Sequence, residues 1–141
     1  MTATQIKLVQ ESFEQLRPIT QTAGELFYKN LFEIAPQARA MFKTPVSEQA
    51  GKLMYTLAYV VNHLHRPESI IADVRKLAIR HIEYGARPEH YTIVGTALLI
   101  TLEQGLGDQW NEILKNAWSA AYTMISNAMI EAASMAGQAA A

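Results

Sequence analysis

Residues 70–81 read IIADVRKLAIRH, and this stretch indicates both a fold class and a possible chemistry. Its apolar residues recur at intervals of three and four, which is the period of an α-helix with one buried face. The predicted buried stripe consists of Ile70, Ile71, Val74, Leu77, Ala78 and His81. An imidazole at the end of such a stripe needs a partner, because buried polar groups are normally paired. Two interpretations stay open here: a hydrogen-bonded core histidine, or a metal ligand, most specifically to an iron in a flat apolar macrocycle.

The composition predicts one domain with a substantial core. The chain has 141 residues, of which 50% are hydrophobic and 18% are charged. Its formal net charge of -1 gives no reason to expect a nucleic-acid partner. The absence of cysteine excludes disulfides, iron–sulfur clusters and thiolate zinc sites.

The N-terminal residues, 1–7, lack the basic start and apolar run of a secretory signal. The longest nearly apolar stretch, Tyr91 to Leu102, is too short to cross a bilayer. We therefore expect a cytoplasmic protein with no membrane partner.

Every segment between the turns predicts helix, and no run alternates with the period of a strand, so the expected fold class is all-α. Thr2 and Gln5 have the spacing of a capping box at the first helix, and Asp108 is expected to cap the last one. The first three helices are expected from Thr2 or Thr4 to the corner at Pro18, over Ala23–Ile34, and from Pro45–Ser47 to about His65, with a short helical turn at Pro36–Met41. The last three are expected over Ile70–His81, from Pro88 or Glu89 to Leu106, and from Asp108 through Met129. Ile113 is expected to face inward on the last helix. The residues beyond Ala132 stay open between a helical extension and a frayed end.

An iron macrocycle in a helical protein needs an axial nitrogen, an apolar slot, a polar group opposite that nitrogen and a cation near the rim. His81 supplies a nitrogen, and Arg80 points towards a rim. Gln49 and Leu53 lie one turn apart and share a helix face, so they could face the His81 helix.

Two aromatic residues complete the set. Tyr28 follows the apolar stripe of the second helix, and Phe42 stands in an irregular corner where a large ring needs something to pack on. Each member has an ordinary alternative. Phe42 fits a plain core and Tyr28 a half-buried tyrosine, whereas Gln49 and Arg80 fit a solvated surface.

In these residues the chain resembles bacterial single-domain globins, close to the haemoglobin type that is fused to reductases in flavohaemoglobins. The resemblance extends from about Thr4 to Ile130. The segments that carry it are Phe27–Phe32 (FYKNLF), Pro36 six residues before Phe42, Gln49–Leu53 (QAGKL), Arg80-His81, His90–Gly95 (HYTIVG) and Ala117–Tyr122 (AWSAAY).

The resemblance implies a globin fold, a three-on-three helical sandwich around a haem pocket, with residues 1–141 as one domain and haem b as cofactor. It makes His81 the proximal ligand of the iron and Phe42 the ring stacked on the porphyrin. Leu53 walls the pocket. Tyr28 and Gln49 become the distal pair that donates hydrogen bonds to dioxygen.

One departure from the family concerns the proximal side. There a tyrosine and a glutamate support the ligand histidine and make it a stronger electron donor. Tyr91 matches the tyrosine, but Ala133 occupies the position expected for the carboxylate. Glu131 lies two residues earlier, about 200° around a helix, and so on the opposite face. We therefore expect a weaker electronic push on the iron, and a lower iron–histidine stretching frequency, than in an intact triad.

The resemblance implies reversible dioxygen binding for storage, delivery, transport or sensing, with nitric oxide and carbon monoxide as further diatomic ligands. The enzyme alternative is nitric oxide dioxygenase, which oxidises nitric oxide to nitrate. It would need a separate reductase, because the chain shows no second domain for flavin or nicotinamide. A haem-free helical interaction domain is the third interpretation.

Overall fold

The computed structural model describes the backbone of residues 1–83 and 85–140, and side chains as far as Met135. Within these residues the structure is helical and contains no strand, so the all-α prediction is confirmed. The helices are α1 (Ala3–Leu16), α2 (Thr20–Ile34), α3 (Val46–Asn62), α4 (Ile71–Glu83), α5 (Pro88–Leu106) and α6 (Glu112–Ala140), and the short 3-10 turns are η1 (Arg17–Ile19), η2 (Pro36–Met41), η3 (Pro67–Ile70) and η4 (Gly107–Gln109).

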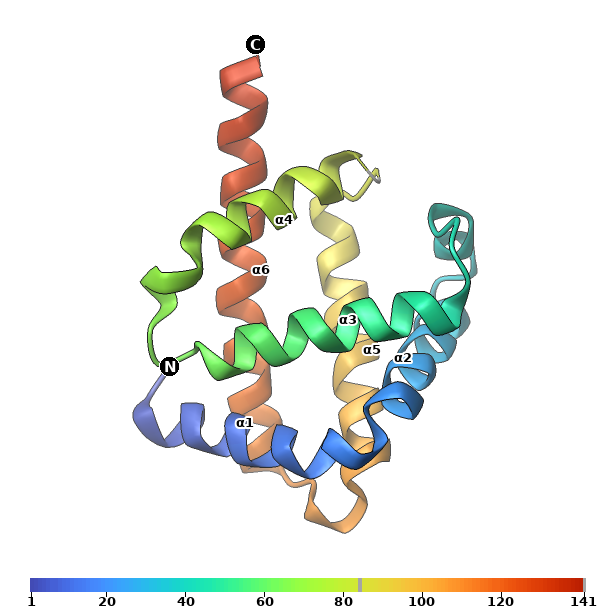
Figure 1. Cartoon of the computed structure of the whole chain (residues 1–141), viewed down its shortest axis with the longest axis vertical. Coiled ribbons are helices and arrows are strands. Elements are labelled where there is room, and N and C mark those ends of the chain that lie inside the picture. The colour runs from blue at the N-terminus through green and yellow to red at the C-terminus, as the bar shows by residue number, and fades with distance from the viewer. Residues whose placement is uncertain (84, 141) are drawn as a thin grey trace.

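The helices form two crossed layers. Figure 1 shows α1, α3 and α4 running across the front of α5 and α6. The main packing pairs are α2 with α3, α2 with α5, α4 with α6, and α1 with α6. This is the expected three-on-three arrangement. None of the helices in the described part combines the length and apolar composition needed to cross a membrane.

The helix ends follow local side-chain chemistry, with one correction. The capping box of Thr2 and Gln5 is present at α1. Asp108 does not cap the last helix, because Gly107, with a φ of +56°, ends α5 and leads into η4. Asn111 takes the capping role instead, and its side-chain oxygen accepts a hydrogen bond of 2.8 Å from the Leu114 amide. The backbone of α6 continues helically beyond Ala132.

Three predicted core positions are exposed. Ile34, expected on the buried stripe of the second helix, is 42% exposed at the last residue of α2. Ile71 is 46% exposed because it lies at the edge of the α4 stripe, at the first residue of the helix. Ile113 is 68% exposed, since the buried face of α6 runs instead through Leu114, Ala117 and Trp118. Helical periodicity predicted these helices but not which residues at the edges of their apolar faces are buried.

Gly24 brings α2 unusually close to α3. A Cβ atom at Gly24 would lie 2.8 Å from the Ala50 Cβ and 2.9 Å from the Ala50 carbonyl oxygen. Tyr28 follows Gly24 by one helical turn, and Gln49 adjoins Ala50. This crossing therefore sets the relative position of two residues expected in the functional site.

We expect Gly24→Ala to lower the free energy of unfolding by about 1–3 kcal/mol, because the added methyl group meets backbone as well as side chain. Gly51→Ala is the matched control on α3, since its Cβ would have only Gln21 Oε1 nearby, at 3.8 Å. There the helical preference of alanine should stabilise by about 0.5–1 kcal/mol. Denaturant titration of both variants measures the difference, and equal effects of the same sign would contradict the close approach.

Candidate functional site

Tyr28 lies in an aromatic cluster at the α2 side of the core. It is 6% exposed. Its ring makes edge-to-face contacts with Phe27 and Phe42, at centroid distances of 5.0 and 5.2 Å, and lies 5.9 Å from Phe32. Phe42 also packs edge-on against Phe32 at 5.8 Å. The structure thus brings Tyr28 and Phe42 into direct contact, and these mutual contacts restrict the orientation of both rings.

Burial raises the pKa of Tyr28 from 10.0 to about 12, because the phenolate form is disfavoured away from water. The hydroxyl is therefore neutral at physiological pH. A neutral phenol can donate a hydrogen bond, as a distal donor must.

This pKa has a consequence for stability at high pH. The folded protein retains the Tyr28 proton to higher pH than the unfolded chain, so the stabilising difference is complete below pH 10 and is lost as pH rises towards about 12. Over that interval the wild type should lose up to about 1.4 kcal/mol of unfolding free energy per pH unit relative to Tyr28→Phe. Denaturant titrations at about pH 9 and about pH 11 test this; a constant difference between the two proteins would refute it.

Gln49 is half-buried in the first turns of α3, and its side-chain amide donates a hydrogen bond to the Thr44 hydroxyl. Thr44 precedes the helix and was not anticipated from the sequence. Its only signal there is a hydroxyl residue just before the Pro45 helix start. The amide of the expected distal glutamine is thus directed by Thr44, whereas Tyr28 is held by aromatic packing.

Leu53 lies one turn beyond Gln49 and is half-buried against the main core. The same partial burial holds along one face of α3. The half-buried apolar residues that continue it are Leu57 and Val60. This helix thus presents an apolar face that its neighbours do not fully cover.

His81 is half-buried near the end of α4. Its Nδ1 atom lies 2.7 Å from the Leu77 carbonyl oxygen. A carbonyl oxygen only accepts, so this contact places a hydrogen on Nδ1, and Nε2 is then the nitrogen that carries the lone pair in the neutral form of the ring. This is the tautomer that second-shell hydrogen bonding selects in histidines that ligate a metal through Nε2. Among the described residues, no three His, Asp or Glu side chains gather as a conventional metal site.

Tyr91 stands beside His81 at the start of α5, with the two rings stacked at a centroid distance of 6.3 Å and an angle of 26°. The Tyr122 hydroxyl donates a 2.5 Å hydrogen bond to the Tyr91 carbonyl and so ties α5 to α6. Gly95 makes room for this tie, since a Cβ there would lie 2.7 Å from Tyr122 Cε2. Gly95 belongs to the segment that resembles the family, but the sequence did not predict its packing role.

Two charged residues near the proximal side in sequence, Arg80 and Glu131, lie at the surface. Arg80 is exposed on α4. Glu131 is exposed on α6, whereas Ala133 is half-buried on the same helix. The carboxylate of Glu131 thus points away from the packed face of α6, as the 200° rotation predicts.

The buried apolar residues form two clusters, although a domain of this size usually has one. The larger cluster contains Tyr28 and is flanked by Phe42 and Leu53. The smaller one lies around α4 and the end of α6 and is flanked by Leu77 and Tyr91. Half-buried apolar side chains flank both clusters. The imidazole of His81 and these half-buried apolar side chains together fit a flat apolar group that carries a metal able to bind an imidazole nitrogen.

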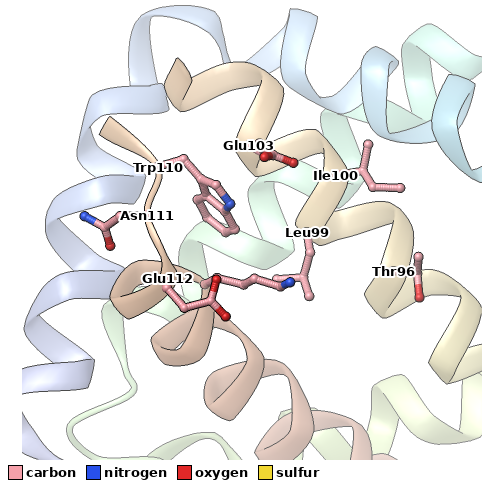
Figure 2. Close-up of a pocket in the computed structure, with 8 residues that line it drawn as sticks. Thr96, Leu99, Ile100, Glu103, Trp110, Asn111 and Glu112 are labelled. Carbon is pink, nitrogen blue, oxygen red and sulfur yellow. The ribbon is translucent and has the colours of Figure 1, made fainter. Parts of the chain in front are cut away.

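A separate pocket lies between α5 and the start of α6 (Figure 2). Its lining residues are Thr96, Leu99, Ile100, Glu103, Trp110, Asn111, Glu112 and Lys115. None of the residues expected at a haem borders it. We therefore treat it as distinct from the candidate site.

Known proteins are similar to this chain in both sequence and fold. Residues 25–129 match the family model described as Globin. A flavohemoprotein from Deinococcus radiodurans is 31% identical over 134 residues, which is 92% of this chain and 33% of that protein. An anaerobic nitrite reductase from Gossypium hirsutum is 30% identical, and the alignment covers 91% of each chain.

Among solved structures, a bacterial globin from Campylobacter jejuni superposes with a TM-score of 0.86 at 26% identity. The match covers 97% of this chain and 99% of that one. By contrast, the chain spans only about a third of the length of the flavohemoprotein that it matches.

Proposed function

Because this chain belongs to the globin family, we propose that it is a haem protein that binds dioxygen reversibly. The state of His81 carries the proposal. Its Nδ1 donates to Leu77, which orients the ring at the end of an apolar helix face and selects the tautomer that ligates a metal through Nε2. We further propose that residues 1–141 act as one domain and that the protein is cytoplasmic.

We assign haem b as the cofactor, with His81 as the iron ligand and Phe42, Leu53 and Tyr91 in contact with the macrocycle. Arg80, which is exposed one residue before His81, is assigned to the propionate rim. When bound, the haem supplies a ferrous iron able to take up dioxygen, nitric oxide or carbon monoxide. The half-buried apolar side chains of the two clusters support this assignment, since a flat apolar group would cover them.

On the distal side, Tyr28 and Gln49 are the proposed donors to a diatomic ligand. Tyr28 is suited to this role because burial keeps its hydroxyl protonated and aromatic contacts restrict its ring. Gln49 is oriented by Thr44. Donors that are already oriented lose little conformational entropy on meeting a ligand, which favours tight binding and slow release.

On the proximal side, Tyr91 stacks beside His81 without a carboxylate at residue 133 to complete a hydrogen-bonded triad. We infer that the histidine donates less electron density than it would in a complete triad. This favours holding dioxygen, for storage or delivery, over activating it.

The second candidate is nitric oxide dioxygenase, favoured by the similarity to a flavohemoprotein. Nitric oxide, dioxygen and one electron balance to nitrate, so each turnover consumes an electron. A separate reductase is the proposed source of that electron.

The test is a set of absorption spectra of the purified, haem-loaded protein in the ferric, ferrous and oxygenated forms. We expect a Soret band and an oxygenated form that returns to the ferrous spectrum when dioxygen is removed. A ferrous form that oxidises without a stable oxygenated spectrum would contradict reversible binding. Catalytic nitric oxide consumption with a supplied reductase would favour the enzyme.

A further inference from the structure

Tyr59 and Asp73 connect α3 with α4 through their side chains. The Tyr59 hydroxyl donates a 2.8 Å hydrogen bond to Asp73 Oδ2. Tyr59 lies in the last turns of α3, and Asp73 lies in the first turn of α4. The two helices have different main packing partners, because α3 packs chiefly on α2 and α4 chiefly on α6. The hydrogen bond therefore joins two parts of the fold whose principal helix contacts lie elsewhere.

The Tyr59 side chain is held from a second direction by His63, one turn later. The two rings lie 4.4 Å apart at an angle of 32°. His63 Nδ1 donates a 2.7 Å hydrogen bond to the Tyr59 carbonyl oxygen, which fixes the imidazole against the phenol. A phenol held in this way loses less freedom when its hydroxyl meets Asp73. The hydrogen bond to Asp73 also raises the pKa of Tyr59, so the phenol remains a donor at neutral pH.

We propose that Tyr59 is a positioning residue that holds α4, and with it His81, against α3. The inference rests on the proposed haem binding. The candidate distal residues Gln49 and Leu53 precede Tyr59 on α3, and His81 follows Asp73 by eight residues on α4. A bond between the last turns of α3 and the first turn of α4 limits how far α4, which carries His81, can move from α3, which carries Gln49 and Leu53. Haem escape requires such movement, so the link should slow haem loss.

The test compares haem dissociation from wild type, Tyr59→Phe and Asp73→Ala, measured by transfer to an excess of a haem-scavenging apoprotein. Each variant should release haem about 3- to 10-fold faster, the range for loss of one hydrogen bond. The double variant should be no faster than the single ones, because both remove the same bond. Tyr55→Phe is the matched control, since Tyr55 is on the same helix, one turn earlier, and is 79% exposed.

A second readout separates positioning from general stability. In Tyr59→Phe the iron–histidine stretching band of the ferrous protein should shift or broaden, and the loss of unfolding free energy should be larger for the haem-loaded than for the haem-free protein. Haem loss and Raman bands equal to those of Tyr55→Phe would overturn the inference and leave the proposed function standing. So would an equal loss of stability with and without haem. A wild-type protein that takes up no haem would overturn both.

Discussion

His81→Ala is expected to abolish stable haem uptake. In the wild type the Leu77 carbonyl holds the hydrogen on Nδ1, which leaves the Nε2 lone pair as the proposed ligand. Alanine removes this nitrogen but preserves helical propensity, so α4 should still form. The variant should therefore bind haem only through apolar contacts. Titration of the apoprotein with haem should show no Soret band of an imidazole-ligated iron.

Added imidazole should restore that band in His81→Ala, because a free ligand can occupy the space of the missing side chain. His65→Ala is the control, since His65 is exposed after the end of α3. It should load haem like the wild type. A His81→Ala protein with the wild-type ferrous spectrum and no response to imidazole would assign the ligand elsewhere.

Tyr28→Phe is expected to raise the dioxygen dissociation rate about tenfold to hundredfold. Dioxygen in a ferrous haem pocket gains partial negative charge, and a charge-assisted hydrogen bond contributes on the order of 1.5–3 kcal/mol. Phenylalanine retains the ring that packs against Phe27 and Phe42 and removes only the hydroxyl. The pocket should therefore keep its shape, and the change in rate reports the donor.

Stopped-flow displacement of dioxygen by carbon monoxide measures this rate. Carbon monoxide develops less negative charge on its outer atom, so its own dissociation rate should change less than that of dioxygen. Tyr55→Phe applies the same substitution at an exposed site and should leave both rates unchanged. An unaltered dioxygen off-rate in Tyr28→Phe would remove Tyr28 from the distal role.

The helices were predictable because their signals are local. Periodic apolar residues, Pro18 and Pro36 at corners, and the spacing of Thr2 and Gln5 all act within a turn or two. The cap of α6 was not predictable in the same way. Asp108 and Asn111 are both good capping residues, and the 3-10 turn that begins at Gly107 decides between them, because it contains Asp108.

The sequence predicts a set of candidate site residues but not the contacts among them. The spacing around Phe42 and His81, together with the family resemblance, selected residues that the structure places in two groups. The bond between Gln49 and Thr44 and the close approach of Gly24 to Ala50 were missed. Both depend on how segments meet in space, which periodicity within one segment does not encode.

The division of the core into two clusters has a consequence for how the chain opens. Among the residues whose side chains are described, α4 shares its buried apolar packing in the smaller cluster, which is formed by Ile70, Val74, Ala78 and Met129. Small clusters give cooperative units of low opening free energy. In the haem-free protein, amide hydrogens of α4 should thus exchange with solvent before those of α2 and α5. Haem binding should then stabilise the folded form of α4, and the protection of its amide hydrogens against exchange should grow with the haem concentration.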